Sequence, residues 1–322
     1  MKKTDELDKK DRLILLTLDR DSRRSISSIS KRLLMPIETV RYRIQRLQST
    51  GLIKKFTAIV DGGRFGFYYY KIFLRLHNTE EKKLRQILTE LSTNPLITWV
   101  VRVDGNYDIG VMCRVKDPSE QSILLDKIRF NYSNYIKRWS LALDIRSDYF
   151  ARDFLTGSKT RAGAKGIFSG QKESYKLDEE SQTVINALTE NARISAKEIA
   201  KDQIFSADTV ANRIKQLEKN KIILRYSLIT DTKLLGHVNV YVLIFLNHLS
   251  PKRERDFFEY CSQQSNIVYM VKSLGNWDYE LNIEANSIQE YRDLVMRLTS
   301  EFSDIIQEYD TLAIDEVLKY QY

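Results

Sequence analysis

The sequence repeats itself at a fixed spacing of 170 residues, and this repeat constrains the fold more than any other feature of the chain. The stretch that begins at Leu7, LDKKDRLILLTLDRDSRRSISSISKRL, matches the stretch that begins at Leu177, LDEESQTVINALTENARISAKEIAKDQ. Sixteen of the sixty positions from Leu7 to Gly66 carry the same residue 170 positions later, without a gap. The match resumes where DGNYD at 104–108 falls on LGNWD at 274–278. Such self-similarity indicates a duplicated structural unit.

The first sixty residues of each copy show the pattern of a small three-helix domain. Spaced apolar residues around Ile14 predict a first amphipathic helix, and Ser25 or Ser195 suits the N-cap of a second. The third helix holds TVRYRIQRL at 39–47 or TVANRIKQL at 209–217. LIKKFTAIV and IILRYSLIT follow, and their β-branched and aromatic residues predict a two-stranded wing in each copy.

Beyond Gly66 the pattern changes to strands. YYYKIFLRL, ITWVVRV, DIGVMCRV and IKRWSLALDI alternate with helical segments near 80–92 and 118–131. The second copy repeats the strands as VNVYVLIFL, IVYMVKSL, DYELNIEA and IIQEYDTLAI. The order strand, helix, two strands, helix, strand is ferredoxin-like, with a sheet that carries two helices on one face. We therefore predict an α+β protein in which each copy joins a winged helix-turn-helix domain to a ferredoxin-like βαββαβ domain.

The domain boundaries follow from these changes of pattern. We place the winged helix-turn-helix domains at 1–62 and 175–232, and the ferredoxin-like domains at 66–150 and 236–322. Residues 151–174, ARDFLTGSKTRAGAKGIFSGQKES, are rich in Gly, Ser and Lys and show no periodicity, so we interpret them as a linker. Such a linker lets the two copies pair within one chain or lets the chain pair with another.

The net positive charge of the chain lies in its first half. Lys and Arg outnumber Asp and Glu by 51 to 43, which gives a formal net charge of +8. Residues 1–160 carry +12 and residues 161–322 carry −4. A basic half suits a polyanion such as nucleic acid or an anionic membrane surface. The N-terminal apolar run is broken by Asp19 and is too short for a signal peptide or a membrane span, so we expect a cytoplasmic protein.

The sequence gives little sign of a metal, a disulfide or a catalytic centre. Cys113 and Cys261 stand alone, without a CxxC pair, in segments that otherwise resemble packed core. Walker loops, paired metal ligands and Ser-His-Asp arrangements are missing from the pattern. We therefore expect no disulfide framework, no zinc site, no cofactor and no enzymatic activity.

The third helix of the first copy has one apolar and one polar face. Val40, Ile44 and Leu47 recur at intervals of four and three and form one stripe. The polar residues, arginines among them, point away from this stripe, either toward solvent or toward a polyanion. Because an α-helix fits the major groove of DNA, its outer side chains could there reach base edges and phosphates.

Taken together, these motifs resemble the Lrp/AsnC family, the feast/famine regulators of bacteria and archaea. The resemblance rests on the opening LD, the R-x-S pattern, TV-x-x-RI-x-x-L, an apolar wing that ends near a glycine, and G-x-x-D in the second domain, each present twice. It implies a transcriptional regulator whose winged helix-turn-helix binds double-stranded DNA. It also implies a sensing domain for an amino acid or other small effector, and self-association through the sheets of the ferredoxin-like domains.

The resemblance assigns DNA contacts to the region around the third helix of each copy. Outward residues of the first copy would read the groove, whereas Arg43 and Arg46 would contact phosphates. An alternative for Arg43 is a packed stem tied to a carboxylate, and Arg23 is either a clamp on the DNA backbone or a loop ion pair. The candidate DNA-binding residues are Arg23, Glu38, Thr39, Arg41, Tyr42, Arg43, Gln45, Arg46, Thr209, Asn212, Arg213 and Lys215.

The second copy departs from the first at its third helix. Ala211 stands where the first copy has Arg41, and Gln216 stands where it has Arg46. The second copy should therefore bind DNA more weakly or read different bases, and an architectural role is the alternative. Pro36 replaces the capping serine that the second copy retains as Ser206.

The G-x-x-D loops are the candidate effector site that the family resemblance implies. A glycine lets a ligand approach the backbone, an aspartate can hold an ammonium group, and an aromatic ring gives an apolar wall. The alternative is a plain hairpin turn, because Gly-Asn is a common turn dipeptide. The candidate effector-binding residues are Gly105, Asn106, Tyr107, Asp108, Gly275, Asn276, Trp277 and Asp278.

Two other functions compete with a DNA-binding regulator. Sirohaem decarboxylases also resemble Lrp/AsnC proteins, and some are fusions of two such units. Those enzymes need histidine and basic side chains in the sensing domain. This chain has His77, His237 and His248, and none of them matches between the copies. The third reading is an assembly partner of other Lrp-like proteins whose own DNA-reading helices are inactive.

Overall fold

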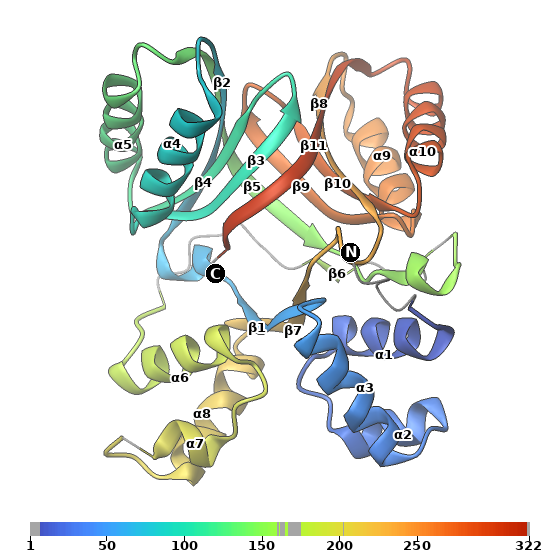
Figure 1. Ribbon diagram of the computed structural model, residues 1–322. Helices are drawn as coiled ribbons and strands as arrows, with labels where there is room; N and C mark the ends of the chain where they lie inside the picture. Colours follow the sequence, from blue (N-terminus) through green and yellow to red (C-terminus); the bar gives the residue numbers. More distant parts are fainter. Residues whose placement is uncertain (1–6, 160, 162–164, 167–174, 202, 321–322) are drawn as a thin grey trace.

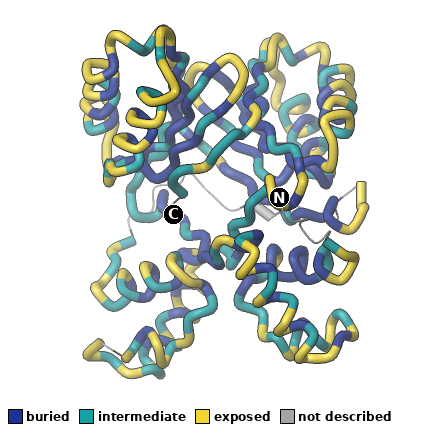
Figure 2. Tube along the Cα trace, in the orientation of Figure 1, coloured by how far each residue is buried: buried dark blue, intermediate teal, exposed yellow. Residues whose placement is uncertain are grey.

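The computed structural model of the protein describes residues 7–159, 161, 165–166, 175–201 and 203–320. Two helical domains lie side by side at one end of the molecule, and a large β-structure flanked by helices lies at the other (Figure 1). Buried residues follow the strands and the inner faces of the helices, whereas exposed residues gather on the outer helices and loop tips (Figure 2). The predicted α+β class is therefore confirmed, with two copies of each kind of domain.

Each helical domain has the three predicted helices. They are α1 (Lys9–Arg20), α2 (Ile26–Leu33) and α3 (Ile37–Ser49) in the first copy, and α6 (Glu179–Glu190), α7 (Ala196–Ala200) and α8 (Ala207–Lys219) in the second. The predicted N-caps are confirmed, because Ser25 accepts a hydrogen bond from the Ser28 amide and Ser195 accepts one from the Glu198 amide. Pro36 gives α3 no side-chain cap, whereas Ser206 caps α8.

The expected two-stranded wing within each copy is wrong. Each copy contributes one strand, β1 (Ile53–Val60) or β7 (Ile223–Thr230), and these two strands pair antiparallel with each other. The pairing exchanges core residues, because Ala58 of β1 packs in the core of the second domain and Leu228 of β7 packs in the core of the first. A strand that pairs with the other copy and is covered by it needs no partner strand from its own copy. A short 3-10 helix, η1 (Gly62–Phe65), follows β1.

The second domains fuse into one closed sheet. Their strands are β2 (Tyr68–Leu76), β3 (Ile97–Gly105), β4 (Ile109–Val115), β5 (Ile136–Tyr149), β8 (Val238–Leu246), β9 (Ile267–Gly275), β10 (Tyr279–Ala285) and β11 (Ile306–Tyr320). The order is β2-β4-β3-β11-β8-β10-β9-β5, and β5 also pairs with β2. The sheet therefore closes into a barrel, and β6 (Lys165–Gly166) lies outside the ring beside β5.

The barrel has two equivalent seams between the copies. At one seam β5 pairs with β9, so that Ala142 lies opposite Gly275. At the other β11 pairs with β3, so that Leu312 lies opposite Gly105, and both pairs are related by the 170-residue shift. The two copies thus pair within one chain, which is the first of the two arrangements that the sequence left open.

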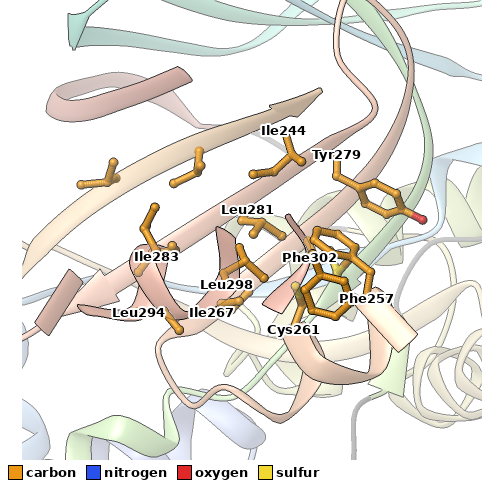
Figure 3. Close-up of a cluster of buried hydrophobic side chains, with 14 of the residues drawn as sticks. Ile244, Phe257, Cys261, Ile267, Tyr279, Leu281, Ile283, Leu294, Leu298 and Phe302 are labelled. Atoms are coloured by element: carbon orange, nitrogen blue, oxygen red, sulfur yellow. The ribbon is translucent and has the colours of Figure 1, made fainter. Parts of the chain in front are cut away.

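Four helices cover the outside of the barrel. They are α4 (Glu81–Thr93), α5 (Pro118–Asn131), α9 (Pro251–Gln263) and α10 (Ile288–Glu301), and they form its two flanks in Figure 1. Phe257 and Cys261 of α9 meet Phe302 and the sheet residues Ile244 and Leu281 in the core of the second copy (Figure 3). Cys113 is buried in the corresponding core of the first copy, so both cysteines lie in packed core as expected.

The segment after β5 packs more closely than a flexible linker would. It forms a short 3-10 helix, η2 (Asp153–Thr156), whose Phe154 and Leu155 are buried in the core of the first helical domain. Arg161 is also buried, and its guanidinium donates to backbone carbonyls of Ser265 and Ile267. The interpretation of 151–174 as a linker stays a prediction, although Phe154, Leu155 and Arg161 within it are packed against other parts of the chain. Most of 162–174 lies outside the described residues.

Candidate nucleic-acid interface and ligand sites

The outer face of α3 is open to solvent. Val40, Ile44 and Leu47 are buried, which confirms the predicted apolar stripe, and Thr39 is half-buried beside it. The four polar residues that point outward, Glu38, Arg41, Tyr42 and Gln45, are all exposed, and Tyr42 shows 64% of its surface. Arg41 pairs with Glu38 across one helical turn, and both side chains remain exposed. The exposed polar residues of this face are Glu38, Arg41, Tyr42 and Gln45.

The other two arginines of α3 point back at their own domain. Arg43 contacts Asp8 at 2.7 Å and Asp11 at 2.8 Å, and Arg46 contacts Asp11 at 2.5 Å. Asp8 and Asp11 form the capping box of α1, and Asp11 is fully buried. The hydrogen bond to Asp11 raises the pKa of Arg43. The structure therefore places Arg43 as its packed-stem interpretation requires, and Arg46 shares the same carboxylate partner. Phosphate contacts of the two arginines stay a prediction.

The second copy repeats this arrangement with different outward residues. Arg213 pairs with Asp178 at 3.0 Å and with Glu180 at 2.7 Å. Thr209 is half-buried, and its hydroxyl lies 3.0 Å from that of Ser206 at the start of α8. Asn212 and Lys215 are exposed. Of the candidate residues on α8, these two face solvent as a DNA contact would require.

Arg23 holds the two helical domains together. Its guanidinium donates to the backbone carbonyls of Ala192 at 2.6 Å and Ile194 at 3.1 Å. Arg193, its equivalent, donates to the carbonyls of Ser22 at 2.6 Å and Arg24 at 3.1 Å. The structure gives Arg23 these carbonyl partners in place of the expected loop ion pair, and a contact with the DNA backbone stays a prediction. The R-x-S pattern instead gives a reciprocal clamp between the copies, whose acceptors are main-chain atoms that the sequence pattern cannot show.

The aspartates of the G-x-x-D loops accept hydrogen bonds from backbone amides. Asp108 accepts a hydrogen bond from the Leu76 amide at 2.6 Å, and Asp278 accepts the equivalent bond from the Leu246 amide at 2.7 Å. Asp108 also contacts Arg75 at 3.3 Å. These carboxylates therefore join each loop to the end of a neighbouring strand, β2 or β8.

The aromatic residues of the same loops are buried inside the barrel. Trp277 and Tyr107 both pack against Phe73, with ring centroids 5.4 Å and 5.7 Å from it. The Tyr107 hydroxyl lies 2.6 Å from that of Ser140. Both rings therefore fill the core between the copies and cannot form the open wall of an effector pocket.

The glycines and asparagines of the loops build the seams. A Cβ on Gly105 would overlap the carbonyl oxygen of Thr311, and one on Gly275 would overlap that of Leu141, so only glycine permits these approaches. Asn276 exchanges two hydrogen bonds with the backbone of Leu141, and Asn106 donates to Asp310. The structure thus gives each of the eight candidate effector residues a contact within the protein, and Asp108 also lines a surface pocket, beside Arg102 and Asp315.

Sequence reasoning missed a polar region inside the barrel. Lys71 is buried and donates to the buried carboxylate of Glu280, and the buried Asp144 lies near this pair. The signal was present, because a lysine in YYYKIFLRL and a glutamate in DYELNIEA interrupt otherwise apolar strands. A cavity of about 150 Å³ adjoins Lys71 and extends to the strands of the wing.

These domains define a winged helix-turn-helix protein with a paired α/β partner domain. A sequence model described as winged helix-turn-helix DNA-binding matches residues 7–54 and 178–223. An uncharacterized HTH-type transcriptional regulator of Pyrococcus horikoshii is 37% identical over 124 residues, which cover 38% of this chain and 77% of that protein. The HTH-type transcriptional regulator FL11 of the same organism is 34% identical over 124 residues, 38% of this chain and 79% of FL11. The chain belongs to the Lrp/AsnC-type family of HTH transcriptional regulators.

The chain also resembles a solved structure that matches both copies at once. The siroheme decarboxylase NirDL covers 98% of this chain and 93% of its own, with a TM-score of 0.62 and 12% sequence identity. At this identity the likeness shows a common tandem fold and nothing about activity. Among the helices that the structure describes, none is long and apolar enough to cross a membrane. The described residues likewise contain no His, Cys, Asp and Glu cluster suited to a metal ion.

Proposed function

We propose that this protein is a non-enzymatic transcriptional regulator that binds duplex DNA through its paired winged helix-turn-helix domains. The observation that carries the proposal is the outer face of α3, which stays exposed in a domain fixed to its counterpart by the wing and the arginine clamp. In this proposal α3 enters the major groove, and Arg41, Tyr42 and Gln45 contact base edges. Glu38 orients Arg41 until DNA competes for it.

The two reading helices contribute unequally in this proposal. α8 offers Asn212 and Lys215 but carries Ala211 at the position of Arg41. A pair of different helices suits a DNA site whose two halves differ in sequence. Arg41 is therefore the residue with the largest expected influence on which base is read.

The test is binding of the whole chain to a fluorescent duplex from its own upstream region, titrated against salt. Arg41→Ala should lower affinity for the preferred duplex by about tenfold and relax discrimination among duplexes, as expected for loss of one base contact. Arg129→Ala is the matched control, because Arg129 also pairs with an acidic residue three positions earlier and is equally exposed, on α5 of the barrel. Equal binding by both variants would overturn the role given to Arg41, and no binding by the wild type would overturn the function.

The likeness to NirDL makes a tetrapyrrole decarboxylase the second candidate. The cavity beside Lys71, at about 150 Å³, is below the usual range for ligand pockets and far below a macrocycle, whereas the larger hollows beside Lys233 and Asp108 have no histidine in their walls. His77 and His248 are exposed, and the buried His237 does not line that cavity. Titration of the purified protein with an iron porphyrin, followed by absorbance, decides between them: a tightly bound tetrapyrrole would favour the enzyme.

A further inference from the structure

The cavity of about 150 Å³ lies where the wing meets the open end of the barrel. Thr57 of β1 and Ser227 to Thr230 of β7 contribute wall residues from the wing, and strands of both copies contribute the rest. The cavity is thus positioned at the joint between the DNA-binding domains and the sensing domains. A molecule bound there would contact both.

The wall of the cavity differs between its two halves although the fold around it is duplicated. Equivalent positions of both copies line it, so the cavity lies at the axis that relates the copies. In a dimer of identical chains, such positions would carry the same residue twice. Duplication removes that restriction, and the equivalent positions in this wall hold Thr57 and Ser227, Lys71 and Tyr241, Trp99 and Tyr269, and Met112 and Asn282.

The charged residues of the wall are already neutralised. Lys71 donates to Glu280, and Arg152 makes a two-bond contact with Glu284 at 2.8 and 2.9 Å. A second carboxylate, Asp19, lies 2.7 Å from Arg152. A charged ligand would lose its hydration and find its counterion occupied, which is costly. The cavity therefore favours an uncharged ligand.

Two asparagines in the wall supply one hydrogen-bond donor and one acceptor. Asn282 lies on β10 and its amide nitrogen donates to Asn239 of β8 at 2.6 Å. This bond leaves the amino group of Asn239 and the carbonyl of Asn282 for other partners. If both amides were turned over, the carbonyl of Asn239 and the amino group of Asn282 would remain instead. In either case the pair is complementary to the N–H and C=O edge of a cyclic amide.

Aromatic rings flank these amides. Trp99 and Tyr241 meet edge to face with centroids 5.5 Å apart, and Tyr269 and Tyr320 complete the wall. A cavity of this volume accommodates about one six-membered ring. We propose that the cavity binds a small, uncharged, planar lactam heterocycle, such as a pyrimidine base, through the edge presented by Asn239 and Asn282. That this ligand is the effector of DNA binding rests on the proposed function, whereas binding itself does not.

Calorimetry of the full chain without DNA tests the site, with uracil as the probe. We expect one uracil per chain with a Kd of about 1 mM or tighter, a range that well-buried small ligands reach. The comparison ligand is 1,3-dimethyluracil, which has the same ring but no N–H and should bind at least about tenfold more weakly. Equal binding of both, or no binding of uracil at millimolar concentration, would overturn the proposal.

Comparison of the two copies suggests a substitution that tests the binding site. Asn282→Met installs the residue that the first copy has at the equivalent Met112, and it should weaken uracil binding about tenfold or more. Asn131→Met, at the exposed end of α5, is the control and should bind like the wild type. If Asn282→Met folds poorly, Asn239→Leu removes the other half of the edge. Unchanged binding in a folded variant of either residue would place the ligand elsewhere and overturn the assignment.

A duplex titration with saturating uracil then tests the link to DNA. A shifted DNA affinity in the wild type, absent in Asn282→Met, is expected if this ligand is the effector. Uracil binding without any shift would overturn the effector role and leave the binding site intact. Failure of DNA binding both with and without uracil would instead contradict the proposed function.

Discussion

The two copies match where they hold each other and differ where they face the cavity and the solvent. Arg23 and Arg193 make the same clamp in both directions, and Gly105 and Gly275 make the same close approach at the two seams. By contrast, Lys71 faces Tyr241 inside the barrel. Contacts between copies need both members of a pair, whereas positions that face a ligand or DNA can change in one copy alone. In this duplicated chain, residues that join the two copies have stayed the same, whereas residues that face the cavity or the solvent have diverged.

The largest effect should come from a seam glycine. In Gly275→Ala the new methyl group would overlap the Leu141 carbonyl oxygen and force the β5–β9 seam apart, so we expect a loss of about 3 kcal/mol or more in the free energy of unfolding. Gly236→Ala has the same kind of backbone strain, with φ +70°, but meets nothing within 4 Å. It should cost only about 1–2 kcal/mol. Urea denaturation measures both, and equal losses would show that the seam contact is unimportant.

The clamp arginines should have smaller and equal effects. Arg23→Ala leaves two carbonyls of the other copy without their charged donor, and Arg193→Ala does the same in reverse, so each should cost about 1.5–3 kcal/mol of unfolding free energy. Arg23→Gln removes the charge and should leave the salt dependence of DNA binding unchanged, because the guanidinium contacts protein carbonyls. A salt slope lowered by about one would instead identify Arg23 as a phosphate contact.

The smallest effect concerns a position where the copies differ. Burial raises the pKa of Asp144, the negative charge of Glu280 adds to this rise, and Lys71 opposes it. The folded state therefore binds the Asp144 proton more tightly than the unfolded chain does. As pH rises above the ordinary pKa range of an aspartate, the free energy of unfolding falls because Asp144 must ionise inside the protein. Its equivalent in the second copy is Ile314, which is uncharged.

Asp144→Asn should therefore raise the Tm at pH 8 by roughly 2–4 °C and have less effect at pH 5. The Tm rises because the substitution removes the Asp144 carboxylate, which shares Lys71 with the carboxylate of Glu280. Differential scanning calorimetry at the two pH values measures the change, with Asp126→Asn, at a half-buried surface position, as control. A larger gain at pH 5 than at pH 8 would contradict the raised pKa.

Local features of the fold could be predicted from the sequence because they depend on neighbouring residues. Periodicity located the helices, and Ser25, Ser195 and Ser206 marked their N-caps. The strands of the barrel followed from apolar runs between helical segments. The apolar stripe of α3 and the exposure of Arg41 likewise follow from helical spacing alone.

Features that join distant parts of the chain could not be predicted in this way. β1 and β7 pair across the repeat, so the sequence of either strand alone cannot show whether its partner is local. The same holds for Phe154, whose burial depends on a groove formed by another domain. Asn239 and Asn282 meet only because the register of β8 and β10 sets them on the same face of the barrel. Charged and amide residues in apolar strands signalled an unusual interior but not its shape.

The pairing of the two copies within one chain changes how the assembly depends on protein concentration. Two separate subunits dissociate on dilution, and their stability rises with the amount of protein present. Here the seams β5–β9 and β3–β11 join parts of a single molecule, so the equilibrium between paired and unpaired copies is independent of how many chains a cell contains. Even a handful of molecules would carry both reading helices already in position.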